Sequence, residues 1–175
     1  MTSKNEGPDK SAELTENEAE LWASLVVFSQ LLTPSMDSRL REVGLTLFEY
    51  GALMSLSDAP GNTLKISEMA ERTYAPVPRM SKVVGRLQDR GLVARAPSAS
   101  DGRAKLIALT EEGREVLDAA STVQATAAHD LVLDRISGED ARTLAGILGP
   151  LVHSLDPAGP VGGLPYRGRV DGVKD

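Results

Sequence analysis

The sequence lacks cysteine and has no long apolar run. Without cysteine the chain cannot form disulfides, sense oxidants through a thiol or hold a metal on thiolates. No apolar stretch approaches the roughly 20 residues of a membrane-spanning helix. The N-terminal MTSKNEGPDKSAELTE has no apolar core of the kind found in signal peptides. We therefore expect a cytoplasmic protein with no membrane partner.

Residue patterns typical of enzymes and metal sites are also missing. The sequence has no recognisable nucleophile and base pair, and its glycine-rich stretch at 159–163 follows no predicted strand. His129 and His153 are 24 residues apart, so a metal would need carboxylates from elsewhere. We expect no catalytic residue, no metal and no cofactor.

Positive charge is concentrated in one part of an acidic chain. The 175 residues have a net charge of −6, and 41% of them are apolar, enough for one substantial core. Between Arg79 and Lys105, seven basic residues face two acidic ones, so this segment carries +5 and the remainder −11. Lysine and arginine close to phosphates provide most of the attraction to nucleic acid. The pattern predicts a surface that binds DNA.

Two capping boxes predict the starts of the first two helices. Thr15 with Glu18 precedes an amphipathic stretch, which proline at position 34 should interrupt or kink before the helix resumes over 36–43. Thr46 with Glu49 opens a nearly all-apolar helix that reaches Leu56 and must be buried. The apolar stripe of the first helix consists of Leu21, Leu25, Phe28 and Leu32.

A helix-turn-helix is predicted next. Residues 64–73 read as a short helix, and residues 78–90 as a second helix that Gly91 ends. Pro78 is compatible with the first turn of that helix, which has no intrahelical amide bond to lose. One face of the second helix is apolar, with Met80, Val83, Val84 and Leu87, and the other is polar, with Arg79, Ser81, Lys82 and Arg86.

A hairpin follows the second helix. Residues 92–96 and 104–109 read as strands, and Asp101 and Gly102 suit a hairpin turn within the tip at 97–103. Helix, hairpin and basic tip together predict a winged helix. The fold class is therefore mainly α with a small β-hairpin wing (α+β), in the form of a winged helix-turn-helix with a flanking helical dimerisation domain.

The terminal helices are predicted to form a homodimer. Thr110 should cap a long helix, and Ser137 a final helix with a stripe of leucines and an expected kink at Pro150. A compact winged module cannot cover the apolar faces of both end helices, so a second copy should. The predicted organisation is a disordered tail at 1–14, dimerisation helices at 15–44 and 113–155, a winged module at 45–112 and a flexible tail at 156–175.

The sequence resembles the MarR family of bacterial winged helix-turn-helix regulators. The resemblance runs from about Leu45, in GLTLFEYGALMSLSD, to Gly113. Its most specific part is DGR at 101–103 followed by LTEEG at 109–113, which is similar to the family pattern D-x-R, then L-T-x-x-G. The preceding RGLVAR at 90–95 resembles the family's entry into the wing.

The resemblance implies roles for individual residues. Residues 78–90 would enter the major groove, and the wing would reach the minor groove with Arg103, which Asp101 orients. Arg95 and Lys105 would lie along the wing near phosphates. The residues implied nearest the major groove are Arg79, Ser81, Lys82 and Arg86. The segment YAPVP at 74–78 departs from the family, which usually has glycine and small hydroxyl residues there.

Other interpretations of the same residues stay open. Arg86 could pair with Asp89 and Arg90 with Glu71, Asp101 could serve only its own turn, and Arg95 and Lys105 could be solvated strand charges. The resemblance also implies, for some members, a small-molecule pocket between the dimer helices and the winged module; core packing is the alternative role of its candidate residues. These candidates are Trp22, Met36, Tyr50 and Met54.

The predicted function is that of a sequence-specific, homodimeric transcriptional regulator. We expect a repressor that binds a roughly palindromic double-stranded operator, because a twofold dimer presents two equivalent helices to the duplex. A small aromatic or phenolic effector is expected to release it. The alternative is a winged-helix protein-interaction or scaffold module that does not bind DNA.

Overall fold

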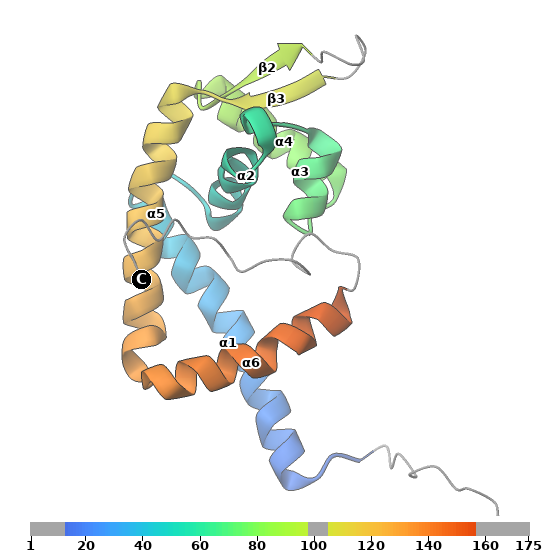
Figure 1. Ribbon diagram of the computed structural model, residues 1–175, viewed down its shortest axis with the longest axis vertical. Helices are drawn as coiled ribbons and strands as arrows, with labels where there is room; N and C mark the ends of the chain where they lie inside the picture. Colours follow the sequence, from blue (N-terminus) through green and yellow to red (C-terminus); the bar gives the residue numbers. More distant parts are fainter. Residues whose placement is uncertain (1–12, 98–104, 157–175) are drawn as a thin grey trace, which may run out of the picture. The chain divides into compact units, whose positions relative to one another are not determined.

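The computed structural model describes residues 13–97 and 105–156 and divides the chain into two compact units, Met1–Ser35 and Met36–Asp175 (Figure 1). The first unit contains most of helix α1 (Glu16–Arg41). The predicted capping box is present, because Glu18 Oε2 accepts from the Thr15 amide at 2.8 Å and Thr15 Oγ1 from the Glu18 amide at 3.4 Å.

Of the interruption or kink expected at Pro34, the interruption is wrong, because helix α1 continues through this residue, and the kink stays a prediction. Proline removes only one backbone donor, and the helix on either side of it stays paired. Ser35 Oγ also donates to the Leu31 carbonyl at 2.8 Å, across the turn that contains the proline. The last residues of α1 belong to the second unit, where Met36 and Leu40 are buried.

The second unit holds the predicted winged helix-turn-helix and two further helices (Figure 1). Its elements are α2 (Leu47–Ser57), β1 (Thr63–Lys65), α3 (Ile66–Arg72), α4 (Val77–Asp89), β2 (Val93–Pro97), β3 (Lys105–Leu109), α5 (Glu111–Leu131) and α6 (Gly138–Leu155). Short 3-10 turns lie at Pro60–Asn62 and Leu133–Arg135. The mainly helical fold with a small antiparallel sheet confirms the predicted fold class.

The sheet has three strands in the order β1-β3-β2. Strands β2 and β3 pair antiparallel as the predicted hairpin, with Val93 opposite Leu109. Strand β1 pairs with the other edge of β3, placing Leu64 opposite Ile107. The prediction of helix from residue 64 is therefore wrong at its start. A strand of three residues is too short for alternation to be visible, and only its pairing with β3 defines it.

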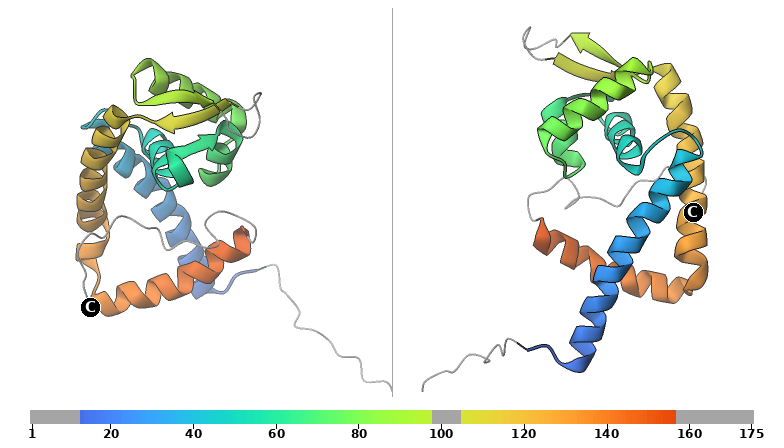
Figure 2. Two further views of the ribbon diagram at one scale, coloured as in Figure 1. Left: turned by 45° about the horizontal axis from the view of Figure 1, so that its top comes forward. Right: turned by 180° about the vertical axis from the view of Figure 1, so that it is seen from behind.

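Helix α2 lies at the centre of the core. It contacts α3, α4, α5 and strands β1 and β3, and the views in Figure 2 show these elements around it. Its buried side chains include Leu53 and Leu56, which are fully enclosed. The predicted N-cap is present: Thr46 Oγ1 accepts from the Glu49 amide, and Glu49 Oε2 accepts from the Thr46 amide at 3.0 Å. The nearly all-apolar composition of α2 thus reflects burial on several sides.

A residue with positive φ follows each of the two helices of the helix-turn-helix. Gly91, at φ +74, follows α4, and the Leu92 amide donates back to the Leu87 carbonyl at 2.9 Å. This confirms Gly91 as the helix stop. Tyr74 occupies the equivalent position after α3 at φ +52, a conformation that costs a residue with a Cβ about 1 kcal/mol. The departure of YAPVP from the family pattern therefore places a strained tyrosine in the turn between α3 and α4.

The start of α5 is packed tightly against the start of the wing. Thr110 is the N-cap, as predicted: its Oγ1 accepts from the Gly113 amide at 3.0 Å and donates to the Gly91 carbonyl at 2.7 Å. The Thr110 amide donates to the Leu92 carbonyl at 3.2 Å. A Cβ added to Gly113 would collide with that Leu92 carbonyl oxygen. The glycine at 113 is therefore required by close backbone approach.

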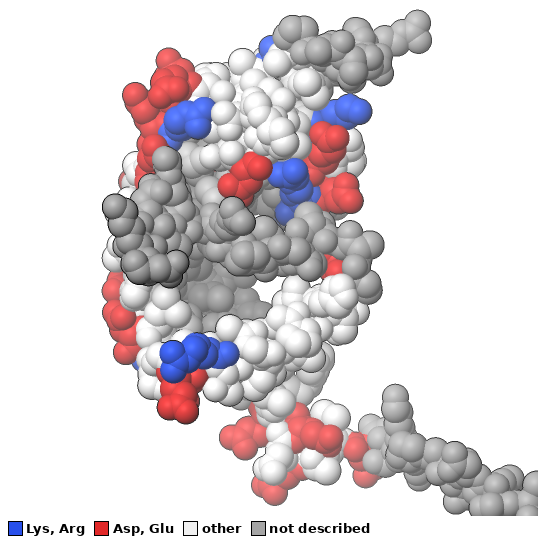
Figure 3. Space-filling model, viewed as in Figure 1, with Lys and Arg blue, Asp and Glu red and all other residues white. Residues whose placement is uncertain are grey.

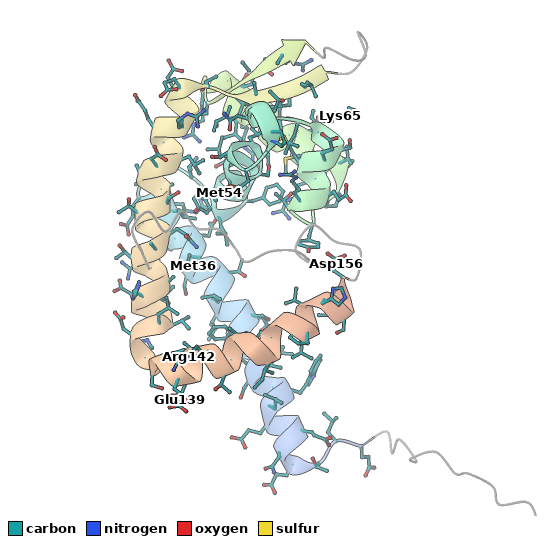
Figure 4. The ribbon with its side chains drawn as sticks, viewed as in Figure 1. Met36, Met54, Lys65, Glu139, Arg142 and Asp156 are labelled. Carbon is teal, nitrogen blue, oxygen red and sulfur yellow. The ribbon has the colours of Figure 1, made fainter. Side chains whose placement is uncertain are left out.

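Helix α6 begins at a Ser137 cap, as predicted, and continues through Pro150. Figures 1 and 2 show α5 leading away from the sheet, so that α6 starts at the end of α5 farthest from the wing. On the face seen in Figure 3, α6 is mostly uncharged, and its charged groups gather near its start, where Figure 4 labels Glu139 and Arg142. Its exposed apolar residues are Leu144, Ile147, Leu148, Leu151, Val152 and Leu155.

The first unit exposes a comparable set of apolar residues on α1. These are Leu21, Trp22, Leu25, Val27, Phe28 and Leu31. Monomeric proteins rarely leave contiguous apolar surfaces of this kind in water. Among the helices in the described part of the chain, none combines the length and apolarity that a membrane span requires.

Candidate nucleic-acid interface

Helix α4 buries one face and exposes the other, as the residue pattern predicts. Met80, Val83, Val84 and Leu87 are buried in the core of the second unit. The helix begins at Val77 with Pro78 in its first turn, where proline fits the backbone. The exposed residues include all four that were predicted to face the major groove, namely Arg79, Ser81, Lys82 and Arg86.

The first turn of α2 holds the arginines on one flank of α4. The Arg79 guanidinium lies over the Phe48 ring, 4.3 Å from its centroid. Arg86 Nε donates to Glu49 Oε1 at 3.2 Å, and Arg90 Nη1 lies 3.9 Å from Glu49 Oε2. The alternative partners, Asp89 for Arg86 and Glu71 for Arg90, are therefore wrong. Both arginines instead lean towards α2, which packs beside α4.

Glu49 is a buried carboxylate whose negative charge is paired with Arg86 and Arg90. Its side chain is 8% exposed, against 56% for Arg86 and 39% for Arg90. Burial works against ionisation of this carboxyl, but the hydrogen bonds from the Thr46 amide and Arg86 outweigh it and lower the pKa of Glu49. The group is thus an anion at neutral pH and an anchor for the polar flank of α4.

Asp37, at the end of α1, makes a similar anchor for the start of α2. Its Oδ1 accepts from the Leu47 amide at 2.8 Å, and its Oδ2 accepts from Arg41 Nε at 2.8 Å. The Leu47 hydrogen bond is the main cause that lowers the pKa of Asp37. The first turn of α2 is therefore held by carboxylates at both Asp37 and Glu49.

The lowered pKa values of Asp37 and Glu49 predict how the free energy of unfolding depends on pH. Because their pKa values in the folded chain lie below the ordinary ones, they stabilise the fold fully above about pH 4.5, and this contribution is lost as the pH falls through the lowered values. We expect the free energy of unfolding, measured in urea at fixed protein concentration, to drop below that pH. Glu49→Gln should flatten the profile, and an identical profile for this variant would contradict the assignment.

Unlike the arginines, the Lys82 and Ser81 side chains form no hydrogen bond, ion pair or ring contact with α2 in the described part of the chain. Both are exposed on α4, and Lys82 forms no ion pair with any residue in the ranges 13–97 and 105–156. At 100° per residue, Lys82 lies nearly opposite the buried Met80 and Leu87. It is therefore positioned to meet a phosphate without first breaking an ion pair.

Among the wing residues predicted to contact DNA, Arg95 has its side chain in the described part of the chain. Arg95 on β2 is exposed, and its Nε donates to Gln88 Oε1 at the end of α4 at 3.3 Å. Lys105 is the first residue of β3, paired with Pro97, but its side chain lies outside the described part. Asp101 and Arg103, predicted at the wing tip, also lie outside the described residues.

The predicted ligand residues fall in two units. Met36 and Tyr50 are buried in the second unit, where Met54 is half-buried and packs against the core. The Tyr50 hydroxyl lies 3.5 Å from both Ser121 Oγ and Gln124 Oε1. Trp22 belongs to the first unit and is 63% exposed.

A metal centre would require several histidine or acidic side chains to lie together. No three histidine or acidic side chains come together to hold a metal ion within the described ranges. His129 lies 3.0 Å from Asp134, and His153 is an exposed residue of α6.

Sequence reasoning recognised Glu49 as a capping residue but missed its contact with α4. A signal was present, because Glu49 is the one charged residue in the sequence LFEYGALMSLS of a helix predicted to be buried. A charged side chain in a buried helix needs a partner of opposite sign. The identity of that partner, 37 residues away along the chain, could not be read from spacing.

Comparison with known proteins agrees with this geometry. A sequence model described as the MarR family matches residues 43–104. The chain is 33% identical over 134 residues to the HTH-type transcriptional repressor Rv2887 of Mycobacterium tuberculosis, a match that covers 77% of this chain and 86% of the relative.

Two solved structures extend the comparison. The MarR family transcriptional regulator Sco3205 of Streptomyces coelicolor, in complex with DNA, has a TM-score of 0.76 and 31% identity over 83% of this chain and 96% of that one. Rv2887 in complex with p-aminosalicylic acid has a TM-score of 0.61 and 32% identity over 75% of this chain and 98% of that one.

Proposed function

Because the chain belongs to the MarR family of transcriptional regulators, and is therefore a DNA-binding protein and not an enzyme, we propose that it is a homodimeric repressor of a roughly palindromic operator. The observation that carries this proposal is α4, which buries its apolar face and presents Arg79, Lys82 and Arg86 on an exposed one. Such a repressor acts on DNA in the cytoplasm.

Helix α4 is proposed to read the major groove. Arg79, Ser81, Lys82 and Arg86 would contact bases and phosphates there, and Arg95 and Lys105 would contact phosphates beside the wing. Arginine has a planar fork of donors that matches guanine edges and phosphates. Arg103 would enter the minor groove, where negative potential is concentrated, and Asp101 would orient it. Sco3205, a regulator of the same fold, is solved in complex with DNA, which supports DNA binding by this fold.

Helices α1 and α6 are proposed to form the dimer. Both expose apolar stripes that water disfavours, and a second copy could cover them. The regions 15–44 and 113–155 would then act as the dimerisation domain, with 45–112 as the DNA-binding domain. A twofold axis would place two α4 helices about one turn of DNA apart, which explains the expected operator symmetry.

A small aromatic effector is proposed to release the repressor. The support is the p-aminosalicylic acid complex of Rv2887, together with the aromatic and thioether groups of Tyr50, Met36 and Met54 in the second unit. Such a ligand can act only if it binds better to a dimer whose α4 helices do not fit the operator. Titration of an aromatic carboxylate against the operator complex would test this.

The role of Lys82 leads to a quantitative prediction. Lys82→Ala should weaken binding to all duplexes by similar factors and reduce the slope of log K against log salt by about 1, because one phosphate contact is lost. Fluorescence anisotropy at several salt concentrations measures both. Arg142→Ala, which removes one charge from α6, should leave the slope unchanged. An unaltered slope for Lys82→Ala would remove this residue from the interface.

A second candidate function, in addition to DNA binding, is that of a protein-interaction or scaffold module. The exposed apolar stripes on α1 and α6 are the observation that favours it, because they can bind other proteins as well as a second copy. A mobility-shift assay with the intergenic DNA next to its own gene tests the proposed repressor. A retarded band at low salt supports it, and the absence of a band with any nearby duplex contradicts it.

A further inference from the structure

We propose that Glu49, which would not touch DNA, is a positioning residue that holds Arg86 for base reading and so helps to determine which sequence α4 selects. The inference rests on the proposed function and goes beyond it. It starts from a single contact between two helices, the 3.2 Å hydrogen bond from Arg86 Nε to Glu49 Oε1.

The geometry of this contact leaves the reading end of Arg86 available. Arginine carries five donors in a fixed plane, and Glu49 engages only the one at Nε. The terminal Nη groups are on a side chain that stays 56% exposed, while the Glu49 side chain is 8% exposed. A guanidinium fixed through Nε can therefore present its Nη groups to the O6 and N7 acceptors of guanine in one orientation.

Glu49 is itself fixed, which makes it a suitable support. Its Oε2 accepts from the Thr46 amide at 3.0 Å, and its own amide donates to Thr46 Oγ1 at 3.1 Å. Asp37 Oδ1 holds the next amide, that of Leu47, at 2.8 Å. The carboxylate therefore belongs to a bonded turn and cannot follow Arg86 if that side chain moves. Groups that orient a contacting residue in this way set the precision of a binding site.

Electrostatic repulsion alone predicts the opposite effect on DNA affinity when Glu49 is removed. A carboxylate beside a DNA-facing surface repels phosphates, so its removal should strengthen binding to every duplex. If Glu49 instead positions Arg86, its removal should weaken binding to the preferred duplex and leave binding to other duplexes equal or stronger. The two explanations differ in sign, so one measurement separates them.

The test uses the full chain and duplexes that it has selected from a random library. Glu49→Gln should bind the selected duplex at least 10-fold more weakly than the parent chain at the same salt. It should bind a mixed-sequence duplex as tightly as the parent or more tightly. Repeated selection with the variant should show relaxed preference at one base pair in each half-site. Equal or tighter binding of the selected duplex by Glu49→Gln would overturn the proposal.

Two controls isolate positioning from folding and from net charge. Glutamine can still form the capping box with Thr46, so the fold should be retained, which the far-ultraviolet spectrum and the melting temperature check. Glu42→Gln makes the same charge change at an exposed residue that has no ion pair in the described ranges. It should alter neither the affinity for the selected duplex nor the selected sequence, and a loss equal to that of Glu49→Gln would overturn the proposal.

Arg86→Lys completes the test. Lysine keeps the charge but has no planar fork, so it should lose the same base preference while retaining binding to mixed-sequence DNA. On the Arg86→Lys background, Glu49→Gln should cause no further loss for the selected duplex, and independent, additive losses would overturn the proposal. Should Glu49→Gln fail to fold, retained selectivity in Arg86→Lys alone would overturn it. If the parent chain selects no duplex, the proposed function itself fails, which is a distinct result.

Discussion

Gly113→Ala is expected to lower the free energy of unfolding by about 3 to 5 kcal/mol, one of the largest effects a single methyl group can have. The new Cβ would collide with the Leu92 carbonyl oxygen and lie 2.9 Å from Leu109 Cδ1. That carbonyl is part of the backbone and accepts from the Thr110 amide, so it cannot move aside as a flexible side chain would. Urea denaturation at fixed protein concentration measures the loss.

Helix propensity alone gives this substitution the opposite sign. Alanine is favoured over glycine inside a helix by about 1 kcal/mol, so without the collision the variant would be more stable. Gly85→Ala in α4 is the matched control, because nothing lies within 4 Å of the Cβ that it adds. We expect Gly85→Ala to be neutral or stabilising. Equal stability of the two variants would show that α5 does not approach the wing as closely as described.

The double variant Leu148→Glu with Leu151→Glu is expected to be monomeric and to bind the operator more than about 100-fold more weakly. Both leucines are exposed on α6, on the same side of the helix as Leu144 and Leu155. Two carboxylates in an apolar interface would lose their water without gaining partners, which costs several kcal/mol. A twofold repressor that loses its partner also loses the second half-site. Sedimentation and anisotropy measure the two effects.

The opposite side of α6 provides the control for this double variant. Arg142→Glu with His153→Glu adds two carboxylates to the same helix about half a turn away from the leucine stripe. This variant should remain a dimer. If both double variants are dimers, α6 does not form the interface. If both are monomers, net charge rather than the leucine stripe controls association.

Many local features could be predicted from the residues nearest to them. The caps at Thr46, Thr110 and Ser137 are local, because a side chain satisfies amides two or three residues ahead. The end of α4 at Gly91 was also a local signal, because glycine adopts positive φ without cost. The buried and exposed faces of α4 followed from a period of 3.6 residues.

Contacts between distant residues were not predictable in this way. Strand β1 is defined by its pairing with β3, more than 40 residues later, and its three residues carry no pattern of their own. The alternative partners Asp89 and Glu71 were wrong, because the carboxylate that contacts both Arg86 and Arg90 is that of Glu49, on α2 and 37 residues before Arg86. Such pairings depend on which helix faces come together, and the residue spacing does not record this.

The sequence alone therefore determined the longer helices, their caps and the concentration of positive charge, because each depends on residues within a few turns of one another. Tertiary structure alone decided how that charge is held. It placed Phe48 under Arg79 and Glu49 beside Arg86, and it brought Gly113 against the Leu92 carbonyl. The physical reason is that these contacts arise only when α2, α4, α5 and the wing share one core, where the direction of each side chain is set by its packing.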